Sequence, residues 1–253
     1  MDFAPEYSVV VPVYNSEKTL WELCDRIEAT FGKIDATFEI ILVNDCSRDN
    51  SWNVIRELKQ KLGDRLTAIH LRRNFGQHKA LLCGFQYAEG EYIITIDDDL
   101  QFSPEDIEVL IGKALNTSAD LVYGSYRDER QHSAPRRWGS FLVGVIFEKF
   151  GNTVGQGSSF KIIHHSVIDK IKDYNHSFTF IDEILSWHTT KIEWANVRHA
   201  ARREGQSGYS RNGKRLCYIG RGIVIGISRL RSSDIASSDT DDMDSAANDS
   251  GDR

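Results

Sequence analysis

The sequence has few cysteines, and their arrangement excludes two kinds of small domain. None of the four cysteines belongs to a C-x-x-C pair, and no cluster of histidine and cysteine has the spacing of a zinc site. A disulfide framework or a structural zinc site is therefore not expected. Reduced structural cysteines are typical of a cytosolic protein. The four are Cys24, Cys46, Cys83 and Cys217.

Signals for secretion, membrane spanning and dinucleotide binding are also missing. The first residues lack the basic start and apolar core of a signal peptide. The apolar segment 216–230 is interrupted by Arg221 and Arg229, and a spanning helix needs roughly 20 largely uncharged residues. This segment is expected either to touch a membrane surface, together with Arg231, or to form an amphipathic helix that packs on the domain or a partner. No G-x-G-x-x-G follows the first expected strand, which argues against a dinucleotide oxidoreductase.

Acidic charge is concentrated at the end of the chain. The formal net charge is -6, and residues 232–253 alone, with seven Asp and one Arg, account for it. This tail is expected to be disordered, because it is rich in Ser and Asp and has almost no large apolar residues. Residues 198–231 are basic, with nine Lys or Arg against one Glu. That basic region is short and has no recognised nucleic-acid-binding module, so we expect no nucleic-acid partner.

Strand-like and helix-like segments alternate along most of the chain, which predicts an α/β fold. Buried strands are expected as short apolar runs, and helices where apolar residues recur at helical spacing. The pattern predicts a doubly wound, mostly parallel sheet that binds ligands at the carboxyl ends of its strands. Strands are expected at 8–12, 38–43, 66–71, 92–96, 120–124, 159–163 and 192–197, and helices at 19–31, 51–62, 77–88, from 103, at 138–150 and at 181–188.

An acidic cluster, Asp97-Asp98-Asp99, directly follows the fourth expected strand. If the chain stays extended there, Asp97 and Asp99 share one face, with Gln101 near them. Oxygen ligands at that density suit Mg²⁺ or Mn²⁺, which could bridge diphosphate oxygens. The alternative is an acidic loop that caps the helix beginning at Pro104.

Two further polar segments stand at strand ends. Val11-Pro12-Val13-Tyr14-Asn15 follows the first strand, and Tyr14 could stack on a base. Asp45 lies in the segment 43–51 after the second strand, where a carboxylate can bind a base or ribose. The alternative for that segment is an ordinary Ser/Asp-rich turn, with Ser51 as the N-cap of the next helix. Together the three segments are expected to meet at one crevice.

The ordered trio PVYN, VNDCSRDNS and DDDLQFSPED resembles the family 2 glycosyltransferases of GT-A fold, over about residues 7–210. Supporting pieces are the segments 73–77, 124–127 and 202–210, and the nearest branch is similar to the polyprenyl-phosphate sugar synthases. The resemblance implies that Pro12, Tyr14 and Asp45 contact the nucleoside, and that Asp97 and Asp98 belong to the nucleotide-sugar site. It also implies that Asp97, Asp99 and Gln101 hold the metal, and that Arg127 and Arg202 neutralise phosphate. These two arginines could instead be ordinary surface residues.

Two departures from that branch bear on the acceptor. Its G-D-F-R-like motif corresponds here to 158–161, with Ser159 at the Asp position, and an acidic tail stands where transmembrane helices often follow. Both favour a hydroxyl acceptor, on a glycan or glycolipid, over a lipid phosphate. A hydroxyl needs a general base, for which Asp182 and Glu183 are the candidates. The alternative is that both are carboxylates at a helix start.

The expected protein is therefore an inverting, metal-dependent hexosyltransferase of surface-glycan synthesis, on the cytoplasmic face of the membrane. Its halves would be 1–125 for the nucleotide sugar and 126–215 for the acceptor, followed by segment 216–231 and the tail. Residues 126–137 would close over the donor and exclude water. Two alternatives stay open, which are transfer to a polyprenyl phosphate and a non-catalytic nucleotide-sugar-binding protein.

Overall fold

The computed structural model describes residues 5–125, 158–174, 180–200 and 227–229. The strands are β1 (Tyr7–Val13), β2 (Phe38–Asn44), β3 (Leu66–Leu71), β4 (Tyr92–Thr95), β5 (Leu121–Ser125), β6 (Lys161–His164), β7 (Ile192–Asn196) and β8 (Ile227–Arg229). The helices are α1 (Leu20–Ile34), α2 (Ser51–Leu62), α3 (Gln77–Phe85), α4 (Ile107–Thr117), α6 (His165–Ile171) and α7 (Ile181–His188), with short 3₁₀ turns η1 (Gly63–Arg65) and η2 (Pro104–Asp106).

All the described strands form one sheet, in the order β7-β5-β6-β4-β1-β2-β3-β8. Strands β4, β1, β2 and β3 are parallel, as are β5 and β7. Strand β6 runs antiparallel between β4 and β5, and β8 runs antiparallel beside β3. The expected α/β fold with a mostly parallel sheet is confirmed.

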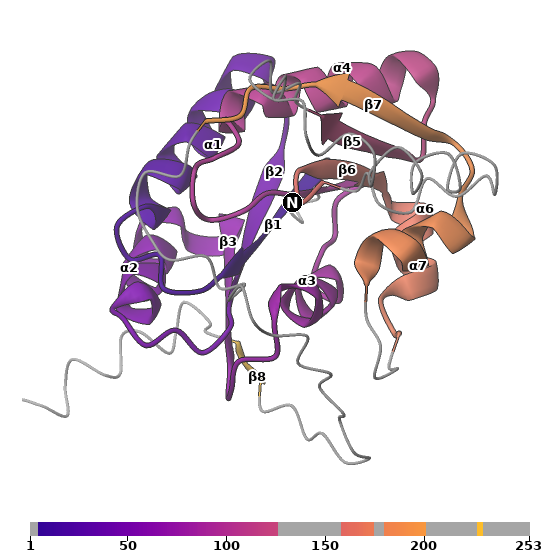
Figure 1. Ribbon diagram of the computed structural model, residues 1–253. Helices are drawn as coiled ribbons and strands as arrows, with labels where there is room; N and C mark the ends of the chain where they lie inside the picture. Colours follow the sequence, from indigo (N-terminus) through magenta and orange to yellow (C-terminus); the bar gives the residue numbers. More distant parts are fainter. Residues whose placement is uncertain (1–4, 126–157, 175–179, 201–226, 230–253) are drawn as a thin grey trace, which may run out of the picture.

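Helices cover both faces of this sheet (Figure 1). Helices α1, α2 and α4 lie over one face, and α3, α6 and α7 lie over the other. Every residue of β1 and β2 is buried, as expected for parallel strands with helices on both sides. In α1 the apolar residues at helical spacing, Leu20, Leu23, Ile27 and Phe31, are all buried. The crossovers therefore bring the loops after β1, β2 and β4 to one edge of the sheet.

Three local expectations are corrected. Asn50, not Ser51, occupies the N-cap of α2, and the Ser51 hydroxyl instead accepts a hydrogen bond from the Ser16 N–H at 2.8 Å. Strand β6 begins at Lys161, two residues later than expected. Within the apolar segment 216–230, residues 227–229 form strand β8 and not a helix. The rest of that segment, the acidic tail and the helix expected at 138–150 lie outside the described residues.

Gly84 allows α3 to approach β1 closely. A Cβ atom at Gly84 would lie 2.4 Å from Val10 Cγ1 and 3.2 Å from Val43 Cγ2. We expect Gly84→Ala to lower the free energy of unfolding by about 1–3 kcal/mol, because the packed core must shift. Urea denaturation measures this. Gly32→Ala is the matched control, since the Gly32 site in α1 is open and alanine favours helix by about 0.5–1 kcal/mol. Equal stability of the two variants would contradict the packing argument.

Candidate functional site

The candidate site lies at the carboxyl ends of β1, β2 and β4, where backbone hydrogen bonds join the three loops. The N–H of Asp45, just after β2, donates to the Val13 carbonyl at the end of β1, at 2.8 Å. The N–H of Tyr14 donates to the Asp98 carboxylate at 2.9 Å. The three polar segments therefore meet, as their positions at the ends of parallel strands predict.

The loop after β1 presents an aromatic side chain. Pro12 is buried in β1 opposite Val43 of β2, whereas Tyr14 is 37% exposed. Asn15 follows in the left-handed region, with φ of 57°, and its side-chain oxygen accepts from the Arg48 N–H at 2.7 Å. The turn thus leaves the Tyr14 side chain exposed, while the Asn15 N–H donates to the Ser47 hydroxyl of the loop after β2 at 3.0 Å.

Asp45 holds the loop that precedes α3. One carboxylate oxygen accepts from the Phe75 N–H at 2.7 Å and the other from the Gly76 N–H at 2.8 Å. Asp45 is only 3% exposed, and burial raises the pKa of its carboxyl group to about 6, although the two backbone donors oppose the shift. Gly76 has a φ of 88°, which suits glycine. Asp45 therefore fixes the start of α3 at the site, whether or not it also binds a nucleoside.

The acidic cluster is a turn and not the extended segment on which the expected alternation of its side chains depends. Strand β4 ends at Thr95, and a turn follows in which Leu100 takes a φ of 58°. The carboxylates of Asp97 and Asp98 accept hydrogen bonds from different elements. The capping alternative is not supported either, because Ser103 and Asp106 occupy the N-caps of η2 and α4.

Asp98 joins the loop after β4 to the loop after β1. Besides the Tyr14 N–H, its carboxylate accepts from the Ser16 hydroxyl at 2.5 Å, and its backbone carbonyl accepts from the Thr19 hydroxyl at 2.6 Å. Burial raises the pKa of the Asp98 carboxyl group to about 7, and the charges of Asp97 and Asp99 add to the shift. Asp98 therefore braces the two loops, which sequence reasoning had placed in the nucleotide-sugar site.

Asp97 is held from two other elements. One carboxylate oxygen accepts from the Gln77 side-chain amide at 2.6 Å, at the start of α3. The other accepts from the Ser159 hydroxyl at 2.5 Å, just before β6. Both donors are far away in the sequence, and sequence reasoning named neither as part of the site.

Asp99 and Gln101 complete the predicted ligand set. Asp99 is 8% exposed, and one of its oxygens accepts from the Gln101 N–H at 3.0 Å. No three acidic, histidine or cysteine side chains among the described residues converge as a ready metal site. Mg²⁺, however, is usually held by one or two carboxylates together with substrate phosphates. The carboxylates of Asp97 and Asp99 fit a divalent ion that takes its remaining ligands from a diphosphate.

Asp182 lies in a buried ion pair. Its carboxylate accepts from the Lys161 ammonium group of β6, which is almost fully buried and also lies over the Tyr123 ring at 5.3 Å. His78 of α3 completes the group. Its Nδ1 is buried without a hydrogen-bond partner among the described residues, and burial, with the Lys161 charge, lowers its pKa. Its ring lies 5.1 Å from that of Phe180, just before α7.

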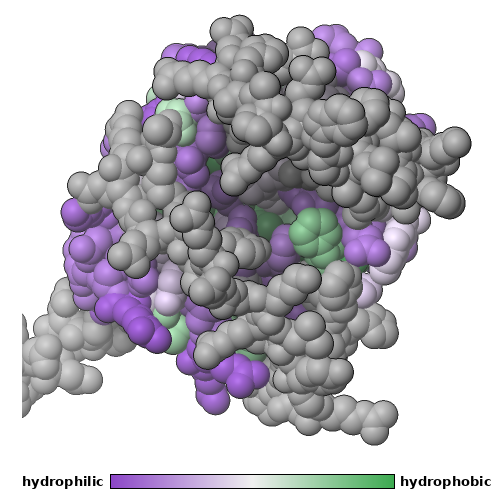
Figure 2. All heavy atoms as spheres, in the orientation of Figure 1, coloured by the Kyte–Doolittle hydropathy of each residue, from purple (hydrophilic) through white to green (hydrophobic). Residues whose placement is uncertain are grey.

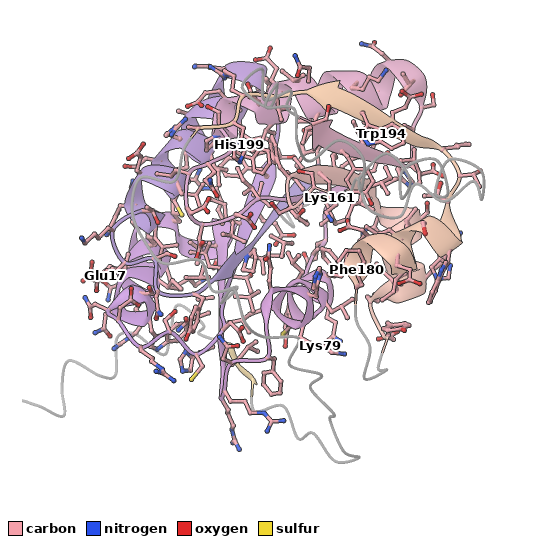
Figure 3. The ribbon with its side chains drawn as sticks, in the orientation of Figure 1. Glu17, Lys79, Lys161, Phe180, Trp194 and His199 are labelled. Atoms are coloured by element: carbon pink, nitrogen blue, oxygen red, sulfur yellow. The ribbon has the colours of Figure 1, made fainter. Side chains whose placement is uncertain are left out.

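Glu183 lies beside Asp182 in the first turn of α7, as the helix-start alternative describes. Figure 3 shows Lys161 and Phe180 where the sheet, α3 and α7 meet. In Figure 2 the described residues visible near the centre of this face are mostly hydrophilic, with a hydrophobic patch beside them. Arg127, Arg202 and the loop 126–137 lie outside the described residues, so their roles stay predictions.

The raised pKa of Asp98 predicts a pH dependence of stability. A carboxyl group in an unfolded chain titrates near pH 4, with a pKa of about 3.9, whereas folding raises that of Asp98 to about 7. The folded state therefore binds this proton more tightly, and its stabilising effect, complete below about pH 4, is lost as the pH rises through about 7. We expect Asp98→Asn, which stays neutral, to lose less stability over this range. Urea unfolding of both proteins from pH 4 to 8 measures the difference, and parallel curves would contradict it.

The site residues belong to a recognised family domain. The model of the family described as "Glycosyl transferase family 2" matches residues 8–175, which include all three loops at the strand ends. In the part of the chain that the structure describes, no helix has the length and apolar composition needed to cross a membrane.

Curated relatives share more than a third of their aligned residues with this chain. The chain is 38% identical over 208 residues to the undecaprenyl-phosphate 4-deoxy-4-formamido-L-arabinose transferase of Pseudomonas aeruginosa strain LESB58, an alignment that covers 80% of this chain and 60% of the relative. It is 37% identical over 204 residues to the protein of the same name from Edwardsiella ictaluri, covering 80% of this chain and 62% of the relative. The chain thus spans less than two thirds of the length of these relatives.

Solved structures show the same fold at lower identity. S. aureus TarS in complex with UDP-GlcNAc has a TM-score of 0.55 at 21% identity, covering 81% of this chain and 62% of that one. Glucosyl-3-phosphoglycerate synthase from Mycobacterium tuberculosis, in complex with Mn²⁺, UDP and phosphoglyceric acid, has a TM-score of 0.53 at 20% identity, covering 78% and 72%. The expected GT-A fold is confirmed. From its family match and its relatives, this chain belongs to glycosyl transferase family 2.

Proposed function

We propose that this glycosyltransferase moves a sugar from a nucleotide-sugar donor to a polyprenyl phosphate. The relatives support this acceptor by name, and it was the alternative to a hydroxyl acceptor in the sequence analysis. The observation that carries the proposal is the Lys161–Asp182 ion pair. Asp182, a candidate base for a hydroxyl acceptor, is engaged by a buried cation. A phosphate acceptor is already anionic and needs no base.

The proposed donor site uses the loops at the strand ends. Tyr14 would stack on the base and Asp45 would contact the nucleoside, next to buried Pro12. Asp97 and Asp99 would hold Mg²⁺ or Mn²⁺, with Gln101 beside them. The ion would supply positive charge against the diphosphate leaving group. Arg127 and Arg202 remain proposed phosphate ligands, since a guanidinium group suits bidentate binding.

The proposed reaction is a single inverting displacement. An oxygen of the acceptor phosphate forms the new bond to the anomeric carbon, while the bond from that carbon to the donor diphosphate breaks. The nucleoside diphosphate leaves with the electron pair. The site's own contribution is to orient the donor and to keep water from the anomeric carbon.

With a polyprenyl phosphate as acceptor, the proposed reaction takes place at a membrane surface. The basic-apolar segment 216–231 is the proposed peripheral contact, because its Arg and Lys neighbours would face anionic headgroups. The proposed location is the cytoplasmic face, where nucleotide sugars are the donors.

Acceptor competition tests the proposal. The purified chain would be incubated with Mn²⁺, a panel of radiolabelled UDP- and GDP-sugars, and either undecaprenyl phosphate or undecaprenol, which differs only in lacking the phosphate. We expect label in the lipid fraction with the phosphate and none with the alcohol. Transfer to undecaprenol or to a glycan hydroxyl would restore the hydroxyl acceptor. Nucleotide-sugar binding without transfer to any acceptor would overturn the proposal in this chain.

A further inference from the structure

The carboxylate of Asp97 is fixed at both oxygens by side chains from outside its own loop. Gln77 Nε2 donates to Oδ1 at 2.6 Å, and Ser159 Oγ donates to Oδ2 at 2.5 Å. A carboxylate with a hydrogen bond at each oxygen is restricted about its side-chain torsions. Its orientation is therefore set by α3 and by the start of β6, and not by the turn that carries it.

The segments that carry the two donors are held by hydrogen bonds near the site. Gln77 is the first residue of α3 and follows Gly76, whose N–H is held by Asp45. The Ser159 carbonyl accepts from the Thr95 hydroxyl at 2.6 Å, and Thr95 ends β4 two residues before Asp97. The donors are thus built on elements of the sheet and helix framework, which gives them a defined position.

The chemistry of these two donors suits cation binding. An amide and a hydroxyl orient a carboxylate without adding a positive charge. Groups that hold a metal-binding side chain in place tune the affinity of that side chain for the metal.

We infer that Ser159 and Gln77 are positioning residues that hold Asp97 for the divalent cation, an inference that rests on the proposed function. The test measures the affinity of the purified chain for Mn²⁺. Electron paramagnetic resonance monitors the binding, in the presence of UDP and, in a parallel series, of GDP. We expect Ser159→Ala to weaken Mn²⁺ binding about 10- to 100-fold. Ser159→Thr, which keeps the hydroxyl, should bind within about threefold of wild type, and Gln77→Ala should resemble Ser159→Ala.

Ser158→Ala is the matched control. The Ser158 hydroxyl lies one residue away and accepts from the Phe160 N–H at 3.2 Å. We expect wild-type Mn²⁺ affinity in this variant. If the role of Ser159 is purely structural, Ser159→Ala will have a lower midpoint of thermal unfolding but an unchanged Mn²⁺ affinity in the folded protein. That result would overturn the inference.

A double-mutant cycle tests whether Ser159 acts through Asp97. If it does, Ser159→Ala adds no further loss of Mn²⁺ affinity to Asp97→Ala. Independent, multiplying losses would overturn the inference and leave the proposed function standing. Failure of the wild-type chain to bind Mn²⁺ with either nucleotide would overturn both the inference and the metal site of the proposed function.

Discussion

Replacing Asp182 by alanine should lower the free energy of unfolding by about 3–5 kcal/mol, since removal of one partner leaves an uncompensated buried charge. Its partner Lys161 is 1% exposed and is enclosed by Tyr123 and α3. Tyr123 gives no compensating negative charge, because burial raises the pKa of its hydroxyl group. Urea unfolding at neutral pH measures the loss.

Two further variants separate the ion pair from general damage to α7. Glu183→Ala, in the same turn, should stay within about 0.5 kcal/mol of wild type unless it touches a special feature. The double variant Lys161→Met/Asp182→Leu should recover most of the stability, because apolar residues of similar volume often replace a buried pair without loss. Asp182→Ala as stable as Glu183→Ala would show that the pair contributes little.

The same variants bear on the acceptor. If Asp182 served as a general base, the double variant would be stable yet inactive toward a hydroxyl acceptor. With a phosphate acceptor we expect the folded double variant to keep transfer activity to undecaprenyl phosphate. Transfer assays at equal folded concentration measure this.

The second large effect concerns turnover. We expect Asp99→Ala to reduce transfer about 10²- to 10³-fold, on the scale of removing one group that stabilises charge in a transition state. Asp99 is nearly buried, accepts a hydrogen bond from the Gln101 N–H, and is one of the two carboxylates proposed to hold the divalent cation. The measurement is donor turnover with Mn²⁺, alongside thermal unfolding with nucleoside diphosphate.

The thermal experiment shows whether the lost turnover reflects lost donor binding. A nucleotide at 100 times its Kd stabilises the wild type by about 2.7 kcal/mol, and in Asp99→Ala this Mn²⁺-dependent part should vanish. Glu108→Ala, an exposed acid on the nearby helix α4, is the control and should behave as wild type. Wild-type turnover in Asp99→Ala would contradict the proposed role of Asp99 in the site.

Hydrophobic periodicity predicted the architecture because it reports burial directly. The strands β1 and β2 and helix α7 lie where short apolar runs and helical spacing place them. The meeting of Tyr14, Asp45 and the acidic loop followed from parallel topology, which brings strand ends to one edge.

The finer geometry of the site depends on information that periodicity does not carry. In the turn after Thr95, Leu100 lies in the left-handed region of φ. Leucine rarely adopts this conformation, so the sequence does not predict it there. The partners of Asp97 are 20 and 62 residues away, and the Lys161–Asp182 pair joins a strand to a later helix. Such pairings can be inferred only once the order of the strands in the sheet is known.

Because β6 runs in the reverse direction, side chains reach the site both from loops that follow strands and from a segment that precedes a strand. The parallel strands β1 and β4 carry the chain toward the site, and side chains after their ends contribute to it. Because β6 runs the other way, the chain enters it at that same edge, and residues just before it, such as Ser159, reach the site from a separate segment. A substitution just before β6 can therefore change how Asp97 is held while the loops after β1, β2 and β4 keep their own sequences.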